Sequence, residues 1–132
     1  MRVYFEDTDL SGIVYHASYL RFMERARSDL LRCLGIDQRR AFEAGEGVYA
    51  VADMALRFVA PARLDDDLLV ETRCLAIGAA TVTMAQRIRR GPRLLVDATV
   101  RAAFLTPGGR PRRQPADWVA RYRGLSRAVQ SA

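Results

Sequence analysis

Residues 18–34 carry apolar side chains at intervals of three, four and seven positions, which is the pattern of one face of an amphipathic α-helix. The stripe is formed by Tyr19, Phe22, Met23, Ala26, Leu30 and Leu34. Ser18 precedes it as a candidate N-cap, and Gly35 follows it as a stop signal. These signals predict one long helix of about 17 residues. Asp37 is in a position to cap a second, short helix that ends near Gly45.

Beyond residue 45 apolar and polar positions alternate, as they do in strands that bury one face. Four runs show this period, at 54–59, 68–76, 81–89 and 94–104. Turn signals end them, at Pro61, Gly78, Arg90–Pro92 and Pro107–Gly109. A shorter strand is predicted at 2–6. Helices and strands are segregated along the chain, which favours an α+β fold with an antiparallel β-sheet of about five strands wrapped around the long helix.

The 132 residues contain no apolar run long enough to span a bilayer, and the N-terminus lacks the apolar segment of a signal peptide. The two cysteines, Cys33 and Cys74, have no metal-ligand spacing, and we interpret both as buried, inert thiols. We therefore expect a cytoplasmic protein with a single domain over residues 1–109. The chain is short for an enzyme that encloses a substrate alone, so a site shared between subunits is expected.

The net charge of +6 is concentrated near the C-terminus. Residues 107–132 hold six of the 21 arginines but only one of the 15 acids. Because the remainder is close to neutral, the charge does not by itself indicate a nucleic-acid-binding protein. We expect residues 110–132 to form a basic, solvated tail with a short helix from Asp117 to Leu125. The alternative is a tail that contacts acidic lipids, an acyl carrier protein or nucleic acid.

The only histidine, His16, and three carboxylates lie just before the predicted helix, the carboxylates being Glu6, Asp7 and Asp9. The first N–H groups of a helix are unpaired and carry partial positive charge, so a carbonyl aimed at them is polarised. A nearby carboxylate can attack that carbonyl or activate a water molecule. Gly12 has no side chain and lets backbone or ligand approach closely. The grouping suits acyl transfer, although composition alone favours acids that merely solvate a loop.

The run D-T-D-x-x-G-x-V-Y-H-x-x-Y, from Asp7 to Tyr19, resembles the active-site signature of the 4-hydroxybenzoyl-CoA thioesterase family. More closely, it is similar to the branch of short acyl-CoA thioesterases associated with the Tol-Pal system. The segments F-M-E-R-A-R-S at 22–28 and A-P-A-R-L-D-D at 60–66 fit the same branch. The resemblance covers most of the chain, from residue 2 to about residue 106.

This resemblance implies a hotdog fold and hydrolysis of coenzyme A thioesters, with no metal and no cofactor. It implies that Asp9 is the catalytic carboxylate, as general base or nucleophile, and that a backbone amide near His16 polarises the thioester carbonyl. His16 itself is implicated in orienting substrate or water. Gly12, Tyr15 and Tyr19 of the same run are the candidate substrate contacts. The family works as dimers or dimers of dimers, which makes a second copy of the chain the expected partner at the site.

Coenzyme A carries phosphates, for which arginine is a suitable partner. The candidates are Arg63, after the turn at Pro61, and Arg89 and Arg90 at the predicted hairpin. The simpler interpretation of each is a solvated sheet face. Two other functions stay open at this stage: a hotdog enoyl-thioester hydratase or dehydratase, and a non-catalytic adaptor that binds acyl thioesters or acyl carrier protein.

Overall fold

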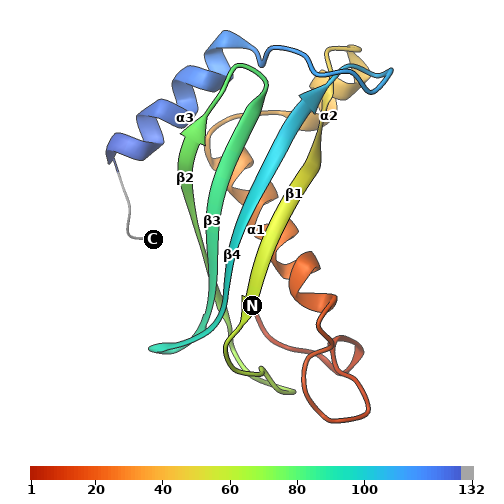
Figure 1. The fold of residues 1–132 in the computed structure, drawn as a ribbon, viewed down its shortest axis with the longest axis vertical. Coiled ribbons are helices and arrows are strands. Elements are labelled where there is room, and N and C mark those ends of the chain that lie inside the picture. The colour runs from red at the N-terminus through yellow and green to blue at the C-terminus, as the bar shows by residue number, and fades with distance from the viewer. Residues whose placement is uncertain (129–132) are drawn as a thin grey trace.

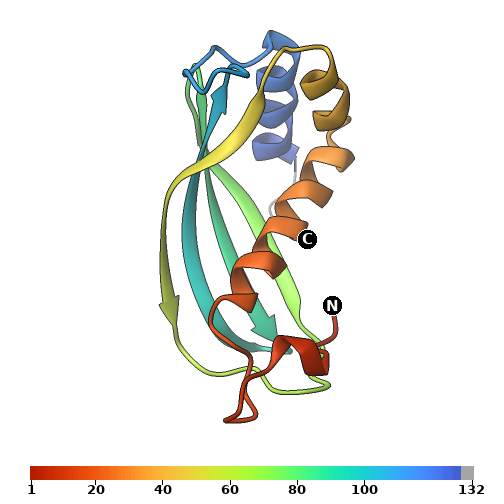
Figure 2. The same cartoon turned by 90° about the vertical axis from the view of Figure 1, so that its right-hand side faces the viewer.

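The computed structural model describes residues 1–128 and contains a four-stranded antiparallel sheet with helices along one face (Figure 1). The strands are β1 (Val48–Phe58), β2 (Leu69–Ile77), β3 (Thr81–Arg90) and β4 (Arg93–Leu105), in the order β1-β4-β3-β2. The helices are α1 (Ser18–Cys33), α2 (Gln38–Glu43) and α3 (Ala116–Ala128), with a 3₁₀-helix, η1, at Phe5–Asp7. Figure 2 shows the sheet curving, with α1 crossing its concave side.

Strands β2, β3 and β4 lie within one residue of the predicted runs, whereas β1 begins at Val48, six residues before the run predicted at 54–59. On β3, side chains two positions apart are buried against the helices, at Val82, Met84, Gln86 and Ile88. Gly91 joins β3 to β4 with a φ of 57°, a left-handed conformation that glycine adopts without a steric penalty. The predicted α+β class and the antiparallel pairing of the strands are confirmed, although β1 pairs with β4 and not with β2, the next strand along the chain.

Helix α1 follows its predicted span but not its predicted cap. Ala17 occupies the N-cap position without a side-chain hydrogen bond, and Ser18 is already helical and buried. The prediction that Ser18 caps the helix is therefore wrong. The other end agrees with the sequence, because Gly35 has a φ of 75° and terminates the last turn. Asp37 caps α2 as predicted, its carboxylate accepting a hydrogen bond from the Arg40 N–H at 3.0 Å.

Residues 2–6 do not form the predicted strand. In the described structure, the strand-like pairing of residues 2–6 is limited to one isolated β-bridge, between Arg2 and Asp67. The chain then turns into η1, where the Asp7 carboxylate accepts a hydrogen bond from the Tyr4 N–H at 2.9 Å. Such a local bond competes with strand pairing. The described sheet consequently has four strands rather than about five.

Two groups of buried apolar side chains form the core. The first lies at the N-terminal half of α1 and comprises Val3, Val14, Tyr19, Phe22, Met23, Ala62, Leu68, Ile88, Leu95, Val96 and Ala98. The second lies at the C-terminal half of α1 and beside α3, and comprises Leu31, Ile36, Ala41, Val82, Met84, Phe104, Trp118 and Tyr122.

The second group corrects the interpretation of residues 110–132 as a solvated tail as far as residue 125, the last whose burial is described; residues 129–132 lie outside the described part of the chain. The predicted terminal helix is present within α3, but its Trp118 and Tyr122 side chains are buried. Trp118 packs edge-to-face against Phe104, with ring centroids 5.3 Å apart. The two buried aromatics are spaced i, i+4, so they share one face of the helix, and the arginines that suggested a solvated tail lie around them. The prediction for Cys33 is also wrong, since this thiol is exposed in the last turn of α1.

Within residues 1–128, no helix is both long enough and apolar enough to cross a membrane.

Candidate active site

The loop before α1 is a small hairpin that presents Asp9. Its backbone is closed by hydrogen bonds from the Asp9 N–H to the Ile13 carbonyl and from the Gly12 N–H to the Asp9 carbonyl, both at 3.0 Å. Gly12 has a φ of 81°, which explains why glycine occurs at this position. Apart from Gly12 and its two chain neighbours, no atom of the described residues lies within 4 Å of the place a Cβ would take, so the space beside Gly12 is open.

The Asp9 side chain is exposed and ionised. Its Oδ1 accepts hydrogen bonds from the Ser11 hydroxyl and from the Ser11 N–H, the latter at 2.8 Å. These two bonds, the hydroxyl first, lower the pKa of Asp9 below its ordinary value of 3.8, and the nearby His16 acts in the same direction more weakly. The carboxylate form is therefore the one present at neutral pH, as a general base or nucleophile requires.

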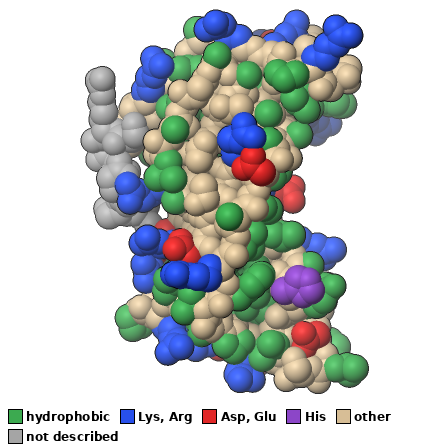
Figure 3. All heavy atoms as spheres, viewed as in Figure 1, with side chains coloured by type: hydrophobic (Ala, Val, Ile, Leu, Met, Phe, Trp, Pro, Cys, Tyr) green, Lys and Arg blue, Asp and Glu red, His purple; other side chains and the backbone are tan. Residues whose placement is uncertain are grey.

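A pocket of about 290 Å³ lies beside His16. Its walls come from the end of the loop, from the first turn of α1, and from the end of β1 with the residues that follow it: Ile13, Val14, His16, Tyr19, Phe58, Val59, Ala60 and Pro61. In Figure 3 the His16 imidazole stands on the surface next to hydrophobic side chains. The Tyr15 ring lies beside the imidazole, with ring centroids 4.6 Å apart. The pocket is thus apolar apart from a few groups at its rim, which suits a hydrocarbon ligand.

Tyr19 contributes its ring to this pocket and its hydroxyl to the fold. The hydroxyl accepts a hydrogen bond from the Ala62 N–H at 3.0 Å, and burial raises its pKa. The ring contacts Phe58, with centroids 5.6 Å apart. The hydrogen bond from Ala62 and the ring contact with Phe58 therefore fix the Tyr19 side chain as a wall of the pocket.

Two backbone N–H groups just before α1 have no hydrogen-bond partner among the described residues. The Ser18 N–H donates to the Tyr15 carbonyl at 2.8 Å, and the Leu20 N–H to the Ala17 carbonyl at 3.2 Å. For the N–H groups of His16 and Ala17, the part of the chain that the structure describes offers no hydrogen-bond acceptor. Unpaired amides at a helix N-terminus are suitable donors to a carbonyl oxygen that gains negative charge.

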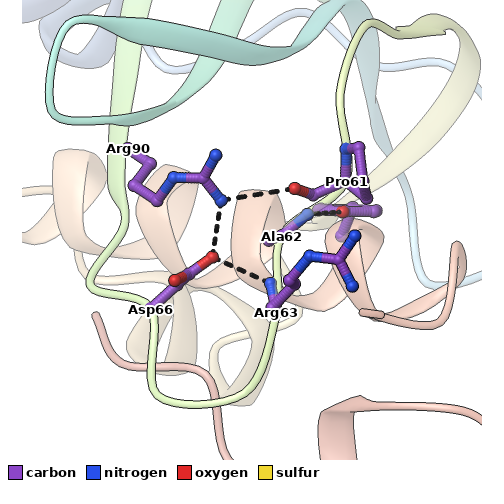
Figure 4. A network of polar contacts seen from close by, with 6 residues as sticks. Pro61, Ala62, Arg63, Asp66 and Arg90 are labelled. Carbon is purple, nitrogen blue, oxygen red and sulfur yellow. Dashed lines mark hydrogen bonds and ion pairs between the residues drawn. The ribbon is translucent and has the colours of Figure 1, made fainter. Parts of the chain in front are cut away.

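The segment 60–66, between β1 and β2, holds the loop in place. The Val14 N–H donates to the Ala62 carbonyl at 2.8 Å, and Ile13 forms a β-bridge with Arg63. The segment is itself closed by the Asp66 carboxylate, which accepts hydrogen bonds from the Arg63 N–H at 2.8 Å and from the Arg90 guanidinium at 2.7 Å (Figure 4).

Known proteins with similar sequences and structures identify the family of this chain. The thioesterase superfamily matches residues 11–96 of the chain. The chain is 42% identical to the acyl-CoA thioesterase YbgC of Haemophilus influenzae over 108 residues, covering 82% of this chain and 79% of the relative. It is 38% identical to the acyl-CoA thioester hydrolase YbgC of Escherichia coli O6:H1 over 125 residues, covering 93% and 92%. Among solved structures, a probable thioesterase from Bartonella henselae matches with a TM-score of 0.83 at 40% identity, covering 87% of this chain and 95% of that one.

The chain belongs to the thioesterase superfamily. Its membership confirms the predicted family, the hotdog form of the α+β fold and the predicted class of enzyme, a thioester hydrolase.

The three arginines predicted to contact substrate lie in different surroundings in this thioesterase. Arg89 pairs with Glu71 on β2, and Arg90 pairs with Asp66. Arg63 is exposed and makes no ion pair among the described residues, and in Figure 4 its guanidinium points away from Asp66. Of the three, Arg63 is the one whose charge is available to a ligand.

The sequence reasoning missed one wall of the pocket in this thioesterase. The alternating pattern places Phe58 and Val59 only at the end of a strand, and Ala60 only in the resembling segment 60–66, whereas all three line the pocket together with His16. The signal was weak: Pro61 marks where β1 must end, and the family resemblance includes the segment that follows it.

Proposed function

We propose that this thioesterase hydrolyses acyl-CoA thioesters, with Asp9 as its catalytic carboxylate. The observation that carries the proposal is the grouping at one end of α1: an ionised, exposed carboxylate, the His16 imidazole and the unpaired amides of His16 and Ala17, next to an apolar pocket. The relatives from Haemophilus influenzae and Escherichia coli, which bear the names acyl-CoA thioesterase and acyl-CoA thioester hydrolase, support coenzyme A as the leaving group.

The reaction needs one carboxylate and one oxyanion site. In one route, Asp9 takes a proton from a water molecule whose oxygen attacks the carbonyl carbon. In the other, an Asp9 oxygen attacks that carbon and forms a mixed anhydride, which water then hydrolyses. In both, the carbonyl oxygen gains negative charge facing the amides of His16 and Ala17, and the carbon–sulfur bond breaks. The products are a free carboxylic acid and coenzyme A.

The pocket beside His16 is the proposed acyl site. Its volume of about 290 Å³ and its apolar walls suit a hydrocarbon or aromatic acyl group, with the thioester at the His16 rim. Arg63 follows the pocket wall in sequence and is bridged to Ile13, so it is the arginine we propose for the coenzyme A phosphates.

A second copy of the chain is the proposed partner at the site. Strand β1 is an edge strand, and its exposed apolar side chains include Val51 and Phe58. Unpaired edge strands readily pair with another chain. Because the pocket is lined by Phe58 at the end of β1, a partner on this edge borders it. A sedimentation measurement tests this directly, and a strictly monomeric active enzyme contradicts it. A cytoplasmic location and an acyl carrier protein partner stay predictions.

The test is thiol release from a panel of acyl-CoA esters, from short aliphatic through aromatic to long-chain, by the purified protein. The proposal predicts release, with the preferred ester naming the substrate class. A folded protein that releases no thiol from any ester, or that only hydrates an enoyl thioester without releasing thiol, contradicts it.

A further inference from the structure

The loop that carries Asp9 has few direct ties to the sheet. Residues 7–17 lie outside the named strands, and apart from bonds to the adjoining residues 4–5 and 18–20, their backbone contacts beyond the loop go to segment 60–66. The Val14 N–H donates to the Ala62 carbonyl, and Ile13 forms its β-bridge with Arg63. The hydroxyl of Tyr19, in the first turn of α1, accepts a hydrogen bond from the Ala62 N–H. The position of the loop therefore depends on the position of Ala62.

Segment 60–66 is in turn tied to the sheet by the Ala60 N–H, which donates to the Leu95 carbonyl of β4 at 3.1 Å, and by the side chain of Arg90. Arg90 is the last residue of β3, a strand with neighbours on both sides. Its Nη1 donates to the Asp66 carboxylate at 2.7 Å and lies 3.4 Å from the Pro61 carbonyl oxygen. Pro61 and Asp66 stand near the two ends of the segment, so one guanidinium holds both. Figure 4 shows Arg90 reaching from the sheet into the bend of the segment.

The surroundings of Arg90 favour a fixed geometry over a mobile, ligand-binding charge. Its side chain is 37% exposed and that of Asp66 is 21% exposed. The same Asp66 carboxylate also accepts the Arg63 N–H, so Arg90, Asp66 and the backbone of the segment form one connected network. A guanidinium engaged in this way has fewer donors left for a phosphate than the exposed Arg63.

We propose that Arg90 is a positioning residue for the hydrolysis, and that its pair with Asp66 sets the location of Ala62 and, through Ala62, that of the loop carrying Asp9 and His16. This inference rests on the proposed function, and it replaces phosphate binding as the role of Arg90. A partly exposed ion pair contributes little to global stability. A small displacement of a catalytic group can nevertheless cost about 100-fold in rate.

The test compares Arg90→Gln, Arg90→Lys and Asp66→Asn with the matched control Arg101→Gln. Arg101 pairs with Asp53 on β1, so the control removes an arginine–aspartate pair from a different part of the sheet.

For Arg90→Gln we expect kcat to fall about 10- to 100-fold while KM for the acyl-CoA ester changes less than about twofold. Arg90→Lys retains a cation for Asp66 and recovers part of the loss. The double variant Arg90→Gln/Asp66→Asn loses less activity than the two single losses combined, because each single change already breaks the bond between Arg90 and Asp66. Arg101→Gln keeps both constants.

Hydrogen exchange of the Val14 amide supplies a readout that is independent of turnover. We expect this amide to exchange at least tenfold faster in Arg90→Gln than in the wild type, and at the wild-type rate in Arg101→Gln. A raised, salt-sensitive KM with unchanged kcat would assign Arg90 to phosphate binding and overturn the inference, as would unchanged kcat together with unchanged exchange. If the wild type releases no thiol, the proposed function fails, and the exchange rate of Val14 still decides whether Arg90 holds the loop.

Discussion

The two ends of α1 are built in opposite ways. At its N-terminal end, the functional polar groups are exposed, as Asp9 and His16 are, and their loop is held by backbone bonds within it and by the bond from Val14 to Ala62. At its C-terminal end, beside α3, the polar groups are buried: Tyr122 is 0% and Gln114 2% exposed. The contrast separates chemistry from stability, because exposed groups remain available to a substrate and buried networks fix the fold.

At the buried end of α1, a chain of hydrogen bonds joins segments that are distant in the sequence. The Tyr122 hydroxyl donates to the Tyr49 hydroxyl at 2.9 Å, and the Tyr49 hydroxyl donates to the Gln114 side-chain oxygen. The Gln114 amide nitrogen then donates to the Gly78 carbonyl at 2.9 Å. Burial raises the pKa of Tyr122 to about 12, so these hydroxyls keep their protons at physiological pH. The network links the segment after β4 to β1 and to the turn between β2 and β3.

The largest effect on stability is expected at this buried end. Tyr122→Ala removes a fully buried aromatic side chain and should lower the free energy of unfolding by about 3–5 kcal/mol, as aromatic-to-alanine changes in cores do. Tyr122→Phe keeps the ring and should cost about 0.5–1.5 kcal/mol. Urea denaturation measures both. Equal stability of Tyr122→Ala and the wild type would mean that α3 is dispensable and that the two ends do not differ as described.

At the exposed end, changing a pocket wall should alter selectivity more than stability. Phe58 is 52% exposed, so Phe58→Ala removes little from the core. We expect it to enlarge the pocket and raise kcat/KM for bulkier acyl groups relative to smaller ones by about 10-fold, within the range for one hydrophobic contact. The control is Phe42→Ala, an exposed phenylalanine on α2, which should leave the order of substrates unchanged. An unchanged order in Phe58→Ala would remove Phe58 from the acyl site.

The smallest expected effect concerns the ionisation of Asp9. Its pKa in the folded protein lies below the ordinary value, so its carboxylate stabilises the fold above the unfolded-state pKa, and that contribution is lost as the pH falls through the folded pKa. Ser11→Ala removes the hydroxyl bond but keeps the bond from the Ser11 N–H. The pKa of Asp9 should therefore rise towards 3.8 in this variant, as followed by NMR titration of the carboxyl carbon. Thr8→Val, which removes a hydroxyl bonded to the Phe5 carbonyl instead, should leave the titration unchanged. A fall in the pKa with Ser11→Ala would contradict the assignment.

The comparison between the two ends also explains what could be predicted from the sequence. The span of α1, the cap at Asp37 and the turn at Gly91 depend on residues a few positions apart, so local patterns suffice for them. The bond between the Asp7 carboxylate and the Tyr4 N–H is also local, but nothing in the alternating pattern of residues 2–6 distinguishes it from a strand. The burial of Trp118 depends on Phe104 and on the sheet, and arginine-rich composition conceals it.

In the candidate site too, residues within one sequence run could be predicted, whereas contacts between distant residues could not. Asp9, His16, Tyr15 and Tyr19 belong to one short run, and sequence reasoning could assign them together through the family resemblance. The contact between Tyr19 and Ala62 joins residues 43 positions apart, and no local pattern reveals it. Pairing of the arginines with Glu71 and Asp66 likewise depends on the register of the folded strands.

The most direct test of the account is the rate of thiol release by Asp9→Asn, with Asp65→Asn as the matched control. Both changes remove one exposed carboxylate, and Asp65 has a φ of 68°, which asparagine tolerates. With the preferred acyl-CoA ester, Asp9→Asn should lower kcat by about 10²–10⁴-fold while its unfolding transition stays at the wild-type position. Asp65→Asn should keep wild-type turnover. Near-normal turnover by a folded Asp9→Asn variant would contradict the assignment of Asp9 as the catalytic carboxylate.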